Sequence, residues 1–336
     1  MNKFISIIIP VRNEIKYIRS CVESVINSDY PKDLVQLLIV DGGSIDGTRG
    51  VVAGYVKKYK FIKMLDNKSQ TAQTGINIGI QEANGSCLFV IGAHAEYPKN
   101  YFSSLAKALF DLGADCVGGV LNTDVKNKSK KSESIKSVLS DIFGVGNSVF
   151  RIGSEQIMEV DTVAFGCYRS DVFKKHGLFD ERLIRNQDIE FNKRIKNKGA
   201  KIYIIPSIVV TYYARDNFID LAKNNYSNGL WNILTTYYTG TFRSLNLRHF
   251  IPLVFVSSVL FPLVLTVFWL KLVYITALSL SAYFIVIFLR SFYLNTKKTS
   301  VFYMLVSFFV LHWSYGFGSL MGLFKVFRIK VCNVFR

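Results

Sequence analysis

Three short polar clusters in this sequence contain groups that can do chemistry. They are Arg-Asn-Glu at residues 12–14, Asp-Gly-Gly-Ser at residues 41–44 and His-Ala-Glu at residues 94–96. The carboxylate of Asp41 can accept hydrogen bonds from a uracil-type N–H or a ribose hydroxyl, and the two glycines after it let a ligand approach the backbone closely. His94 and Glu96 lie two residues apart, so on a regular strand they share a face and can hold a metal ion together.

The elements that must position these clusters alternate between strand and helix. Residues 5–11 form a continuous apolar, β-branched run, which is typical of a strand buried on both faces. Repeated alternation predicts a parallel sheet with helices on both faces, in which ligands bind at the carboxyl ends of the strands, where the three clusters lie. We predict strands over 5–11, 35–40, 61–65 and 87–91, and helices over 14–26, 46–58 and 72–83.

Charge and cysteine content narrow the class of protein. The chain has 336 residues and a formal net charge of +17, which fits either nucleic acid or anionic lipid head groups as a partner. We favour lipid, because the C-terminal third is strongly apolar and no nucleic-acid-binding motif is visible. The five cysteines are scattered and never in Cys-x-x-Cys spacing, which indicates reduced thiols. No signal peptide is expected, because the first apolar run is short and charged residues follow it directly.

The composition of the chain changes near residue 240. Three apolar stretches follow, at residues 250–269, 272–289 and 301–324, each about as long as the roughly 20 residues that cross a bilayer core. We therefore predict an α/β domain over residues 1–240 and a membrane region over residues 241–336.

Basic residues predict the orientation of these segments. Loops rich in Lys and Arg stay in the cytosol, which places both the start of the first segment and the end of the second there. The basic tail conflicts with an ordinary third span. Either the third segment is a re-entrant hairpin broken at Gly316 and Gly318, or the charge rule fails here. The basic residues are Arg243 and Arg248 before the first segment, Arg290, Lys297 and Lys298 after the second, and Lys325, Arg328, Lys330 and Arg336 in the tail.

A lysine- and serine-rich stretch at residues 124–136 predicts an exposed, mobile loop. Such a tract is typical of a solvated surface, and a mobile loop beside a site can also act as a lid.

Several motifs, taken in order, resemble family 2 glycosyltransferases with the GT-A fold. The text IIIPVRNE at residues 7–14 looks like the first strand of that family, and VDGGSIDGT at residues 40–48 is similar to its second signature. The stretch from Asn77 to Gly85 matches the approach to its metal-site strand. The resemblance covers about residues 4–240 and is specific in this order and spacing. It implies a Rossmann-like, mostly parallel sheet with helices on both faces, followed here by transmembrane helices, and an inverting sugar transfer.

The resemblance assigns roles to the donor side of the site. It implies that the loop behind the first strand lines a nucleotide pocket, which places four of its residues near the donor. Asp46 is better explained as a cap of the following helix. The donor-binding residues that we predict are Pro10, Val11, Asn13, Glu14, Asp41, Gly43, Asn77 and Gly92.

The fourth strand departs from the pattern of the family. An Asp-x-Asp motif usually binds a divalent cation there, but these positions hold Gly92 and His94. The sequence around them resembles that of the succinoglycan-type glucosyltransferase branch. Two interpretations stay open: a weakly held Mg²⁺ or Mn²⁺ with His94 and Glu96 as ligands, or neutralisation of the donor diphosphate by the basic surface without a metal.

The acceptor side of the resemblance spans residues 163–190. It implies that Asp188 is the catalytic base, which takes the proton of the acceptor hydroxyl during an inverting transfer. The preceding residue is Gln187, where the family usually has Glu. The alternative is that Asp188 and Glu190 only cap or solvate the following helix. Arg182 and Arg185 either meet phosphates or face water.

These features together predict a membrane-bound enzyme. We expect it to transfer a single sugar from a nucleotide-diphosphate sugar to a lipid-linked saccharide in cell-surface or exopolysaccharide biosynthesis. The predicted location is the cytoplasmic (inner) membrane, multi-pass, with the catalytic domain in the cytosol. The partners we expect are the donor, the acceptor, membrane lipids and a polysaccharide assembly complex, with no nucleic acid. The alternatives are a non-catalytic nucleotide-sugar-binding scaffold subunit of such a complex, and a transport protein whose transferase-like domain is only an anchor.

Overall fold

The computed structural model of this chain describes residues 3–240 and 246–334. Arg243 and Arg336, which entered the orientation argument, lie outside the described residues. The chain forms two compact units: residues 1–122 with 148–213, and residues 123–147 with 214–336. These units do not coincide with the division at residue 240, because residues 123–147 and 214–240 pack with the apolar helices.

The first unit is built on a nine-stranded sheet in the order β3-β2-β1-β4-β8-β6-β9-β5, with β7 paired to β9. The neighbours β3, β2, β1 and β4 are parallel, as predicted, whereas β8 pairs antiparallel with β4 and β6, and β9 with β5 and β7. The sheet is therefore mixed beyond β4. The strands are β1 (Ile5–Val11), β2 (Val35–Asp41), β3 (Ile62–Asp66), β4 (Cys87–Val90), β5 (Ala95–Glu96), β6 (Cys116–Asp124), β7 (Met158–Glu159), β8 (Cys167–Arg169) and β9 (Ile202–Tyr213).

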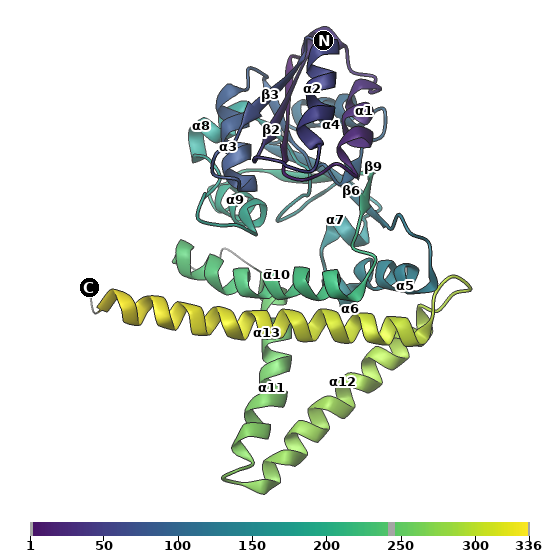
Figure 1. Cartoon of the computed structure of the whole chain (residues 1–336), viewed down its shortest axis with the longest axis vertical. Coiled ribbons are helices and arrows are strands. Elements are labelled where there is room, and N and C mark those ends of the chain that lie inside the picture. Colours follow the sequence, from purple (N-terminus) through teal and green to yellow (C-terminus); the bar gives the residue numbers. More distant parts are fainter. Residues whose placement is uncertain (1–2, 241–245, 335–336) are drawn as a thin grey trace. The chain divides into compact units, whose positions relative to one another are not determined.

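Helices cover both faces of this sheet (Figure 1). Because side chains alternate along a strand, Ile7 of β1 packs in the core under α1, α2 and α4, while Ile8 packs under α3, α8 and α9. Both faces of β1 and β2 are thus buried, as their apolar runs predict. The helices are α1 (Ile18–Ile26), η1 (Lys32–Leu34), α2 (Thr48–Lys58), α3 (Ala72–Glu82), α4 (Tyr101–Asp111), α7 (Val149–Ile152), α8 (Ser170–His176) and α9 (Gln187–Lys196).

The first helix begins later than predicted, at Ile18 rather than at residue 14. Residues 14–17 form a turn instead, in which the carbonyl oxygen of Glu14 accepts from the N–H groups of Tyr17 (2.9 Å) and Ile18 (2.8 Å). The Glu14 N–H donates to the Thr48 hydroxyl (2.8 Å). A tertiary contact therefore satisfies a backbone group that the sequence pattern alone assigns to a helix.

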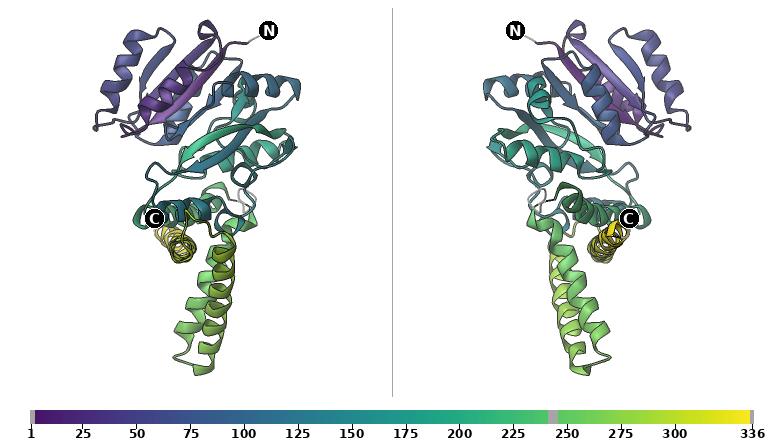
Figure 2. Two further views of the ribbon diagram at one scale, coloured as in Figure 1. Left: turned by 90° about the vertical axis from the view of Figure 1, so that its right-hand side faces the viewer. Right: turned by 90° about the vertical axis from the view of Figure 1, so that its left-hand side faces the viewer.

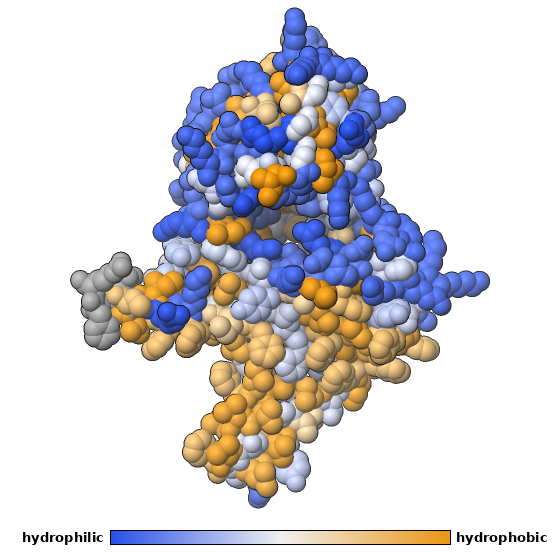
Figure 3. Space-filling model, in the orientation of Figure 1, coloured by the Kyte–Doolittle hydropathy of each residue, from blue (hydrophilic) through white to orange (hydrophobic). Residues whose placement is uncertain are grey.

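The second unit is helical, and three of its helices are long and apolar enough to cross a membrane by length and composition. Figures 1 and 2 show α11 and α12 as a hairpin, and the face of this hairpin seen in Figure 3 is mostly hydrophobic. The three predicted apolar segments are confirmed as helices. The elements are α5 (Lys130–Leu139), α6 (Ile142–Val145), α10 (Phe218–Thr239), η3 (Leu247–Phe250), α11 (Ile251–Leu265), η4 (Leu270–Leu272), α12 (Val273–Tyr293) and α13 (Val301–Val334).

The structure decides one open alternative for this unit and corrects one prediction. The third apolar segment is one continuous helix, so the alternative of a hairpin broken at Gly316 and Gly318 does not hold. These glycines allow close packing instead, since a Cβ on Gly318 would meet the backbone of Tyr226 on α10. The stretch over residues 124–136 is also not an open loop throughout, because the Ser129 and Ser132 side chains cap the start of α5.

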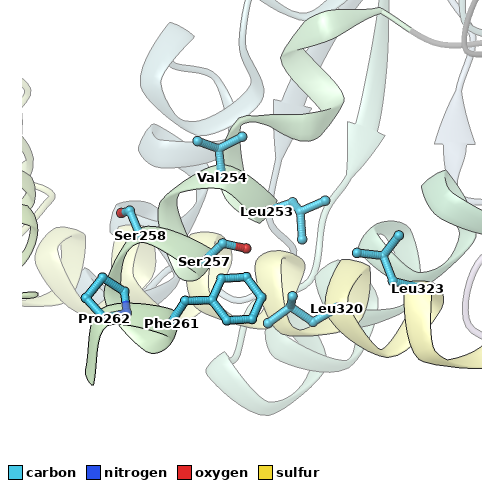
Figure 4. Close-up of a pocket in the computed structure, with 8 residues that line it drawn as sticks. All are labelled: Leu253, Val254, Ser257, Ser258, Phe261, Pro262, Leu320 and Leu323. Atoms are coloured by element: carbon cyan, nitrogen blue, oxygen red, sulfur yellow. The ribbon is translucent and has the colours of Figure 1, made fainter. Parts of the chain in front are cut away.

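An apolar groove of about 540 Å³ lies on α11 and α13 (Figure 4). Its lining is almost entirely carbon, which is typical of a surface that faces lipid acyl chains. The lining residues are Leu253, Val254, Ser257, Ser258, Phe261, Pro262, Leu320 and Leu323.

Close packing of α3 on β1 depends on Gly79. A Cβ at Gly79 would run into the side chain of Ile8, which is fully buried. We expect Gly79→Ala to lower the free energy of unfolding by about 1–3 kcal/mol, because overpacking forces neighbouring atoms to move. Gly54 in α2 is the matched control, since a Cβ there meets nothing within 4 Å. Gly54→Ala should be neutral or stabilising by up to about 1 kcal/mol. Thermal unfolding of both variants checks this, and equal midpoints would contradict it.

Candidate active site

The ends of β1 and β2 bring the first two polar clusters together. Pro10 lies opposite Val40, and Val11 lies opposite Asp41, in a parallel register. Gly42, directly after β2, donates its N–H to the carbonyl oxygen of Val11 (2.8 Å). The predicted donor-side residues of these two strands are therefore neighbours at the carboxyl edge of the sheet, where ligands bind in sheets of this kind.

The loops that follow these two strands are locked to each other. Asn13, at φ 56°, donates its backbone N–H to the hydroxyl of Ser44 (2.8 Å), and its side-chain oxygen accepts from the N–H of Ile45 (2.9 Å). Asp46 accepts from the N–H groups of Ile15 and of Thr48, the first residue of α2 (both 3.0 Å), but the N-cap position predicted for it is occupied by Gly47. The sequence places these loops on the same edge, and the hydrogen bonds make them one rigid surface.

Asp41 is the charged centre of this surface and is 1% exposed. Its carboxylate accepts from the N–H of Gly43 (3.1 Å), the hydroxyl of Ser44 (2.5 Å) and the guanidinium of Arg49 (2.7 Å). Burial alone would raise the pKa of Asp41, but the hydrogen bonds from Ser44 and Arg49 outweigh it and hold the pKa below its usual range. Asp41 is therefore ionised at neutral pH, and its carbonyl oxygen also accepts from the N–H of Asn67 (2.8 Å) after β3.

A ring fills the space beside Gly92, where the family pattern has its first aspartate. A Cβ at Gly92 would lie 2.6 Å from Cε1 of Phe165. Phe165 has a φ of 52°, and its carbonyl oxygen accepts from the Tyr101 hydroxyl (2.5 Å). The hydroxyl of Tyr97 accepts from the N–H of Gly92 and donates to its carbonyl oxygen (both 2.9 Å). Any side chain at this position would displace Phe165, so the glycine and the ring are matched.

His94 pairs with Glu14 rather than with Glu96. Its Nε2 lies 2.8 Å from Oε1 of Glu14, and its ring packs edge-on against Tyr17, with ring centroids 4.4 Å apart. Glu96 lies in β5, opposite Thr211 of β9. The contact with Glu14 joins the end of β1 to the segment after β4, which links two of the three clusters named from the sequence.

The described residues offer part of a coordination shell for a cation. Nδ1 of His94 is buried and has no hydrogen-bond partner, so one imidazole nitrogen is unused. Among residues 3–240 and 246–334, no group of three or more His, Cys, Asp or Glu side chains could hold a metal ion. Nε2 of His94 and the Glu14 carboxylate, 2.8 Å apart, could serve as two ligands of a divalent cation such as Mn²⁺, with phosphate oxygens and water completing its shell.

Asp188 is the second residue of α9, beside the N-terminus of that helix. The residue is exposed at the surface of the unit. Burial raises the pKa of Asp188 above its usual range, against the opposing effects of its own N–H, the N–H of Ile189 and the charge of Arg151. Glu190 differs, because it is buried and bonded to Arg194 (2.7 Å). The purely structural role within the helix, which the sequence left open for both carboxylates, therefore suits Glu190.

Asn77 holds the segment that leads to Asp188. Its side-chain nitrogen donates to the carbonyl oxygen of Phe179 (2.9 Å) and to the carboxylate of Glu181 (2.9 Å), while its oxygen accepts from the N–H of Phe179 (3.0 Å). Gln73, one turn earlier on α3, donates to the carbonyl oxygen of Glu181 (3.0 Å). The structure thus gives Asn77 three internal contacts, and a role in donor binding stays a prediction.

One arginine near the site was considered from the sequence and another was not. Arg182 is exposed, as one of its two predicted alternatives has it, and forms an ion pair with Asp180 (2.7 Å). Sequence reasoning missed Arg151, whose charge acts on Asp188 and whose guanidinium lies 5.5 Å from the ring centroid of Tyr212. Its only signal in the sequence is an isolated basic residue in an apolar stretch, which is too weak to identify a site.

Comparison with known proteins shows the family and the fold of the chain. The model of a family described as glycosyl transferase family 2 matches residues 6–176. A similar protein is dolichyl N-acetyl-alpha-D-glucosaminyl phosphate 3-beta-D-2,3-diacetamido-2,3-dideoxy-beta-D-glucuronosyltransferase of Methanococcus voltae, 37% identical over 67% of this chain and 72% of that protein. The succinoglycan biosynthesis protein ExoA of Rhizobium meliloti is 27% identical, over 64% of each chain. Among solved structures, the mannosyltransferase PcManGT of Pyrobaculum calidifontis, in complex with GDP-Man and Mn²⁺, has a similar fold. The TM-score is 0.61 at 12% identity, over 97% of this chain and 88% of that one.

The raised pKa of Asp188 predicts an effect on stability. An acid whose folded pKa lies above its unfolded value, about 3.9 for Asp, destabilises the fold as pH rises from that value through the folded pKa. Asp188→Asn removes the charge. We therefore expect the variant and the wild type to unfold at the same temperature below about pH 4, and the variant to be the more stable at neutral pH.

Asp180 provides a control of opposite sign. Its hydrogen bond from Arg182 lowers the pKa of Asp180, so its charged form stabilises the fold above the unfolded pKa. Asp180→Asn should therefore lose stability at neutral pH and match the wild type in acid. Thermal unfolding across pH measures both variants, and a destabilised Asp188→Asn at neutral pH would count against the raised pKa.

Proposed function

Because the chain belongs to glycosyl transferase family 2, we propose that it transfers one sugar, with inversion, from a nucleotide-diphosphate sugar to a lipid-linked saccharide. The observation that carries this proposal is Asp188, a solvent-reached carboxylate at the start of α9 whose pKa is raised. Such a group is suited to accept a proton from an acceptor hydroxyl, because a general base works best when its pKa approaches the operating pH.

The reaction assigned to this site is a single displacement. The acceptor oxygen attacks the anomeric carbon from the face opposite the nucleoside diphosphate, and the bond from that carbon to the diphosphate oxygen breaks. Asp188 takes the hydroxyl proton as the oxygen attacks, and the diphosphate leaves with the electron pair. The presence of Asp188 as a candidate base favours an enzyme rather than a non-catalytic scaffold subunit. The relatives that are named as transferases favour an enzyme as well.

The donor lies along the joined loops after β1 and β2 in this proposal. Pro10, Val11, Asn13 and Glu14 line it on one side, and Asp41 with Gly43 on the other. The support is their common position at the carboxyl edge of parallel strands, together with the low pKa of Asp41, which keeps an acceptor of hydrogen bonds ionised. The GDP-Man in the PcManGT complex supports a sugar nucleotide as the donor.

The cation assigned to the site is Mg²⁺ or Mn²⁺, held by His94 and Glu14. This differs from the pair predicted from the sequence, because Glu14 rather than Glu96 lies 2.8 Å from the imidazole. When bound, the cation neutralises charge on the leaving diphosphate. The Mn²⁺ in the PcManGT complex and the closeness of His94 Nε2 to the Glu14 carboxylate support it.

The acceptor is a saccharide linked to a polyprenyl phosphate or diphosphate. The support is the relative in Methanococcus voltae, whose name specifies a dolichyl phosphate sugar, and the presence of candidate membrane helices in the same chain. The location that follows is the cytoplasmic membrane, with the catalytic unit in the cytosol, where nucleotide sugars are made. A polysaccharide assembly complex remains a prediction about partners.

Replacement of the base tests the chemistry. We expect Asp188→Asn to lower turnover by about 10²–10⁴-fold and to leave the dissociation constant of the donor nearly unchanged. Asp171→Asn, an exposed carboxylate on α8, is the matched control and should keep full activity. In the wild type, activity should fall in acid with an apparent pKa above the usual value for Asp, about 3.9. The assay uses a panel of nucleotide sugars with a polyprenyl-diphosphate-linked saccharide, and full turnover by Asp188→Asn would sink the assignment.

Removal of the metal tests the cation. We expect a chelator to abolish most activity and added Mn²⁺ or Mg²⁺ to restore it. His94→Ala should raise the Mn²⁺ concentration needed for half-maximal activity by about tenfold or more, and Glu96→Gln should change it little. Binding of Mn²⁺ measured without substrate by paramagnetic resonance gives a second readout. Activity that is insensitive to the chelator would favour neutralisation of the diphosphate by basic side chains instead.

A further inference from the structure

Helices α10 and α13 lie side by side and run in the same direction (Figure 1). Near their starts, the rings of Phe218 and Tyr303 are 6.3 Å apart. Further along, a Cβ on Gly322 of α13 would touch Ile233 of α10. Two contacts in the same order along both helices show that they are parallel over most of the length of α10.

The pair is held too closely to act as two independent helices. Glycines let the backbones meet, because a Cβ on Gly229 would run into the carbonyl group of Tyr315. The hydroxyl of Ser319 donates to the carbonyl oxygen of Gly229 (3.2 Å), and Asn232 donates to the Tyr315 hydroxyl. Whatever position α13 takes in a membrane, α10 must take beside it.

Helix α10 is poorly suited to the inside of a bilayer. Among the described residues it is not one of the helices apolar enough to span. Its first turns carry Asp220 and Lys223, both exposed. Polar and charged side chains at membrane depth cost several kcal/mol unless they are paired within the protein.

The connectivity of the second unit also argues against a position of α10 and α13 across the bilayer. Suppose that α11 and α12 both span and that α13 also spans, with α10 beside it. If α10 ran from the cytosol outward, α11 would return and α12 would go out again, so α13 would begin outside. The start of α13 lies beside the start of α10, which contradicts this. The parallel pair and a spanning hairpin are therefore incompatible with a spanning α13.

The side of α13 away from α10 carries an apolar stripe. Its large exposed side chains recur at helical spacing along almost the whole helix, as on a surface helix with one apolar face. They are Phe302, Phe309, Phe317, Phe324, Phe327 and Val331. Lys325, Arg328 and Lys330 lie in the same half of the helix as the last of these, where long basic side chains can reach lipid phosphates.

The polar segment that contains α5 and α6 contacts the end of α12 and the start of α13. Ser134 of α5 accepts from the N–H of Ser300 at the start of α13 (3.0 Å), and the carbonyl oxygen of Phe143 lies 2.8 Å from Nε2 of His312. The chain around α5 carries lysines, and Asp141, which is 5% exposed, pairs with Arg290 near the end of α12 (2.5 Å). The end of α12 and the first third of α13 therefore lie beside polar chain.

We propose that α13 does not cross the membrane but lies in the plane of its cytosolic surface, with the apolar stripe in the acyl chains and α10 on the aqueous side. The partner of this surface is a leaflet containing anionic lipid, which fits the basic residues of α13. The hairpin of α11 and α12 is then the only part of the described chain that spans. This arrangement leaves the basic tail in the cytosol, in agreement with the charge rule that an ordinary third span would break.

A depth measurement separates the two arrangements. Nitroxide labels are placed at Phe309, Phe317 and Phe324, each changed to Cys in a Cys332→Ser background of the full chain in vesicles with anionic lipid. The other four cysteines are buried. In a spanning helix, positions 309 and 324 would differ by roughly 22 Å in depth. We expect the three labels to lie at the same shallow depth, judged by relative accessibility to oxygen and to a nickel chelate. A deep label at 317 between two shallow ones would overturn the proposal.

Native Cys332 provides an independent test, because it is the exposed cysteine near the end of α13. A membrane-impermeant maleimide should label it in inverted vesicles and not in right-side-out ones. In the Cys332→Ser background, Lys271→Cys between α11 and α12 should show the opposite pattern, and Thr299→Cys between α12 and α13 the same pattern as Cys332. Labelling of Cys332 from the side of Lys271→Cys would overturn the proposal. Each variant is first checked for retained glycosyl transfer, and if Cys332 is labelled from neither side the depth profile decides.

Discussion

The candidate site depends on one buried amide, the side chain of Asn77. Its three hydrogen bonds join α3, which packs on the parallel half of the sheet, to the segment that leads into α9. Leaving buried partners unsatisfied costs about 1–3 kcal/mol each, so the amide fixes this segment tightly. The contact requires α3 to lie close against β1, which Gly79 allows. The loops after β1 and β2 and the carboxylate of Asp188 thereby belong to one rigid framework.

Within that framework, two aspartates have opposite environments. Asp41 receives hydrogen bonds from Ser44 and Arg49 that hold its pKa low, whereas desolvation of the Asp188 carboxylate raises its pKa. Two carboxylates whose pKa values differ can take different roles in a site, since one stays charged and the other can exchange a proton. The fold achieves this by placing Asp41 at a strand end under backbone N–H groups and by desolvating Asp188 enough to outweigh the N–H groups at the start of α9, which lower its pKa.

The departures from the family pattern also have structural causes. Gly92 stands where an aspartate is usual because the ring of Phe165 occupies the adjoining space. His94 is paired with Glu14 because the loop after β1 turns back before α1 begins. In the second unit, glycines on α13 serve close packing against α10 rather than a break in the helix. Each case combines a local sequence signal with a partner that is distant in the chain.

The sequence by itself determined the family, the parallel half of the sheet, the three apolar segments and the candidate roles of Asp41, His94 and Asp188, because apolar periodicity and short motifs are local. Only the tertiary structure decided that Asn77 holds the segment before α9, that His94 contacts Glu14, and that residues 130–136 belong to α5. It also showed α13 as one helix parallel to α10. The physical reason is that these outcomes depend on which groups meet across long separations in the chain, as Asn77 meets Glu181 and Tyr226 meets Gly318. Composition and periodicity report the preference of a segment for strand, helix or lipid, but not the neighbour that satisfies its polar groups.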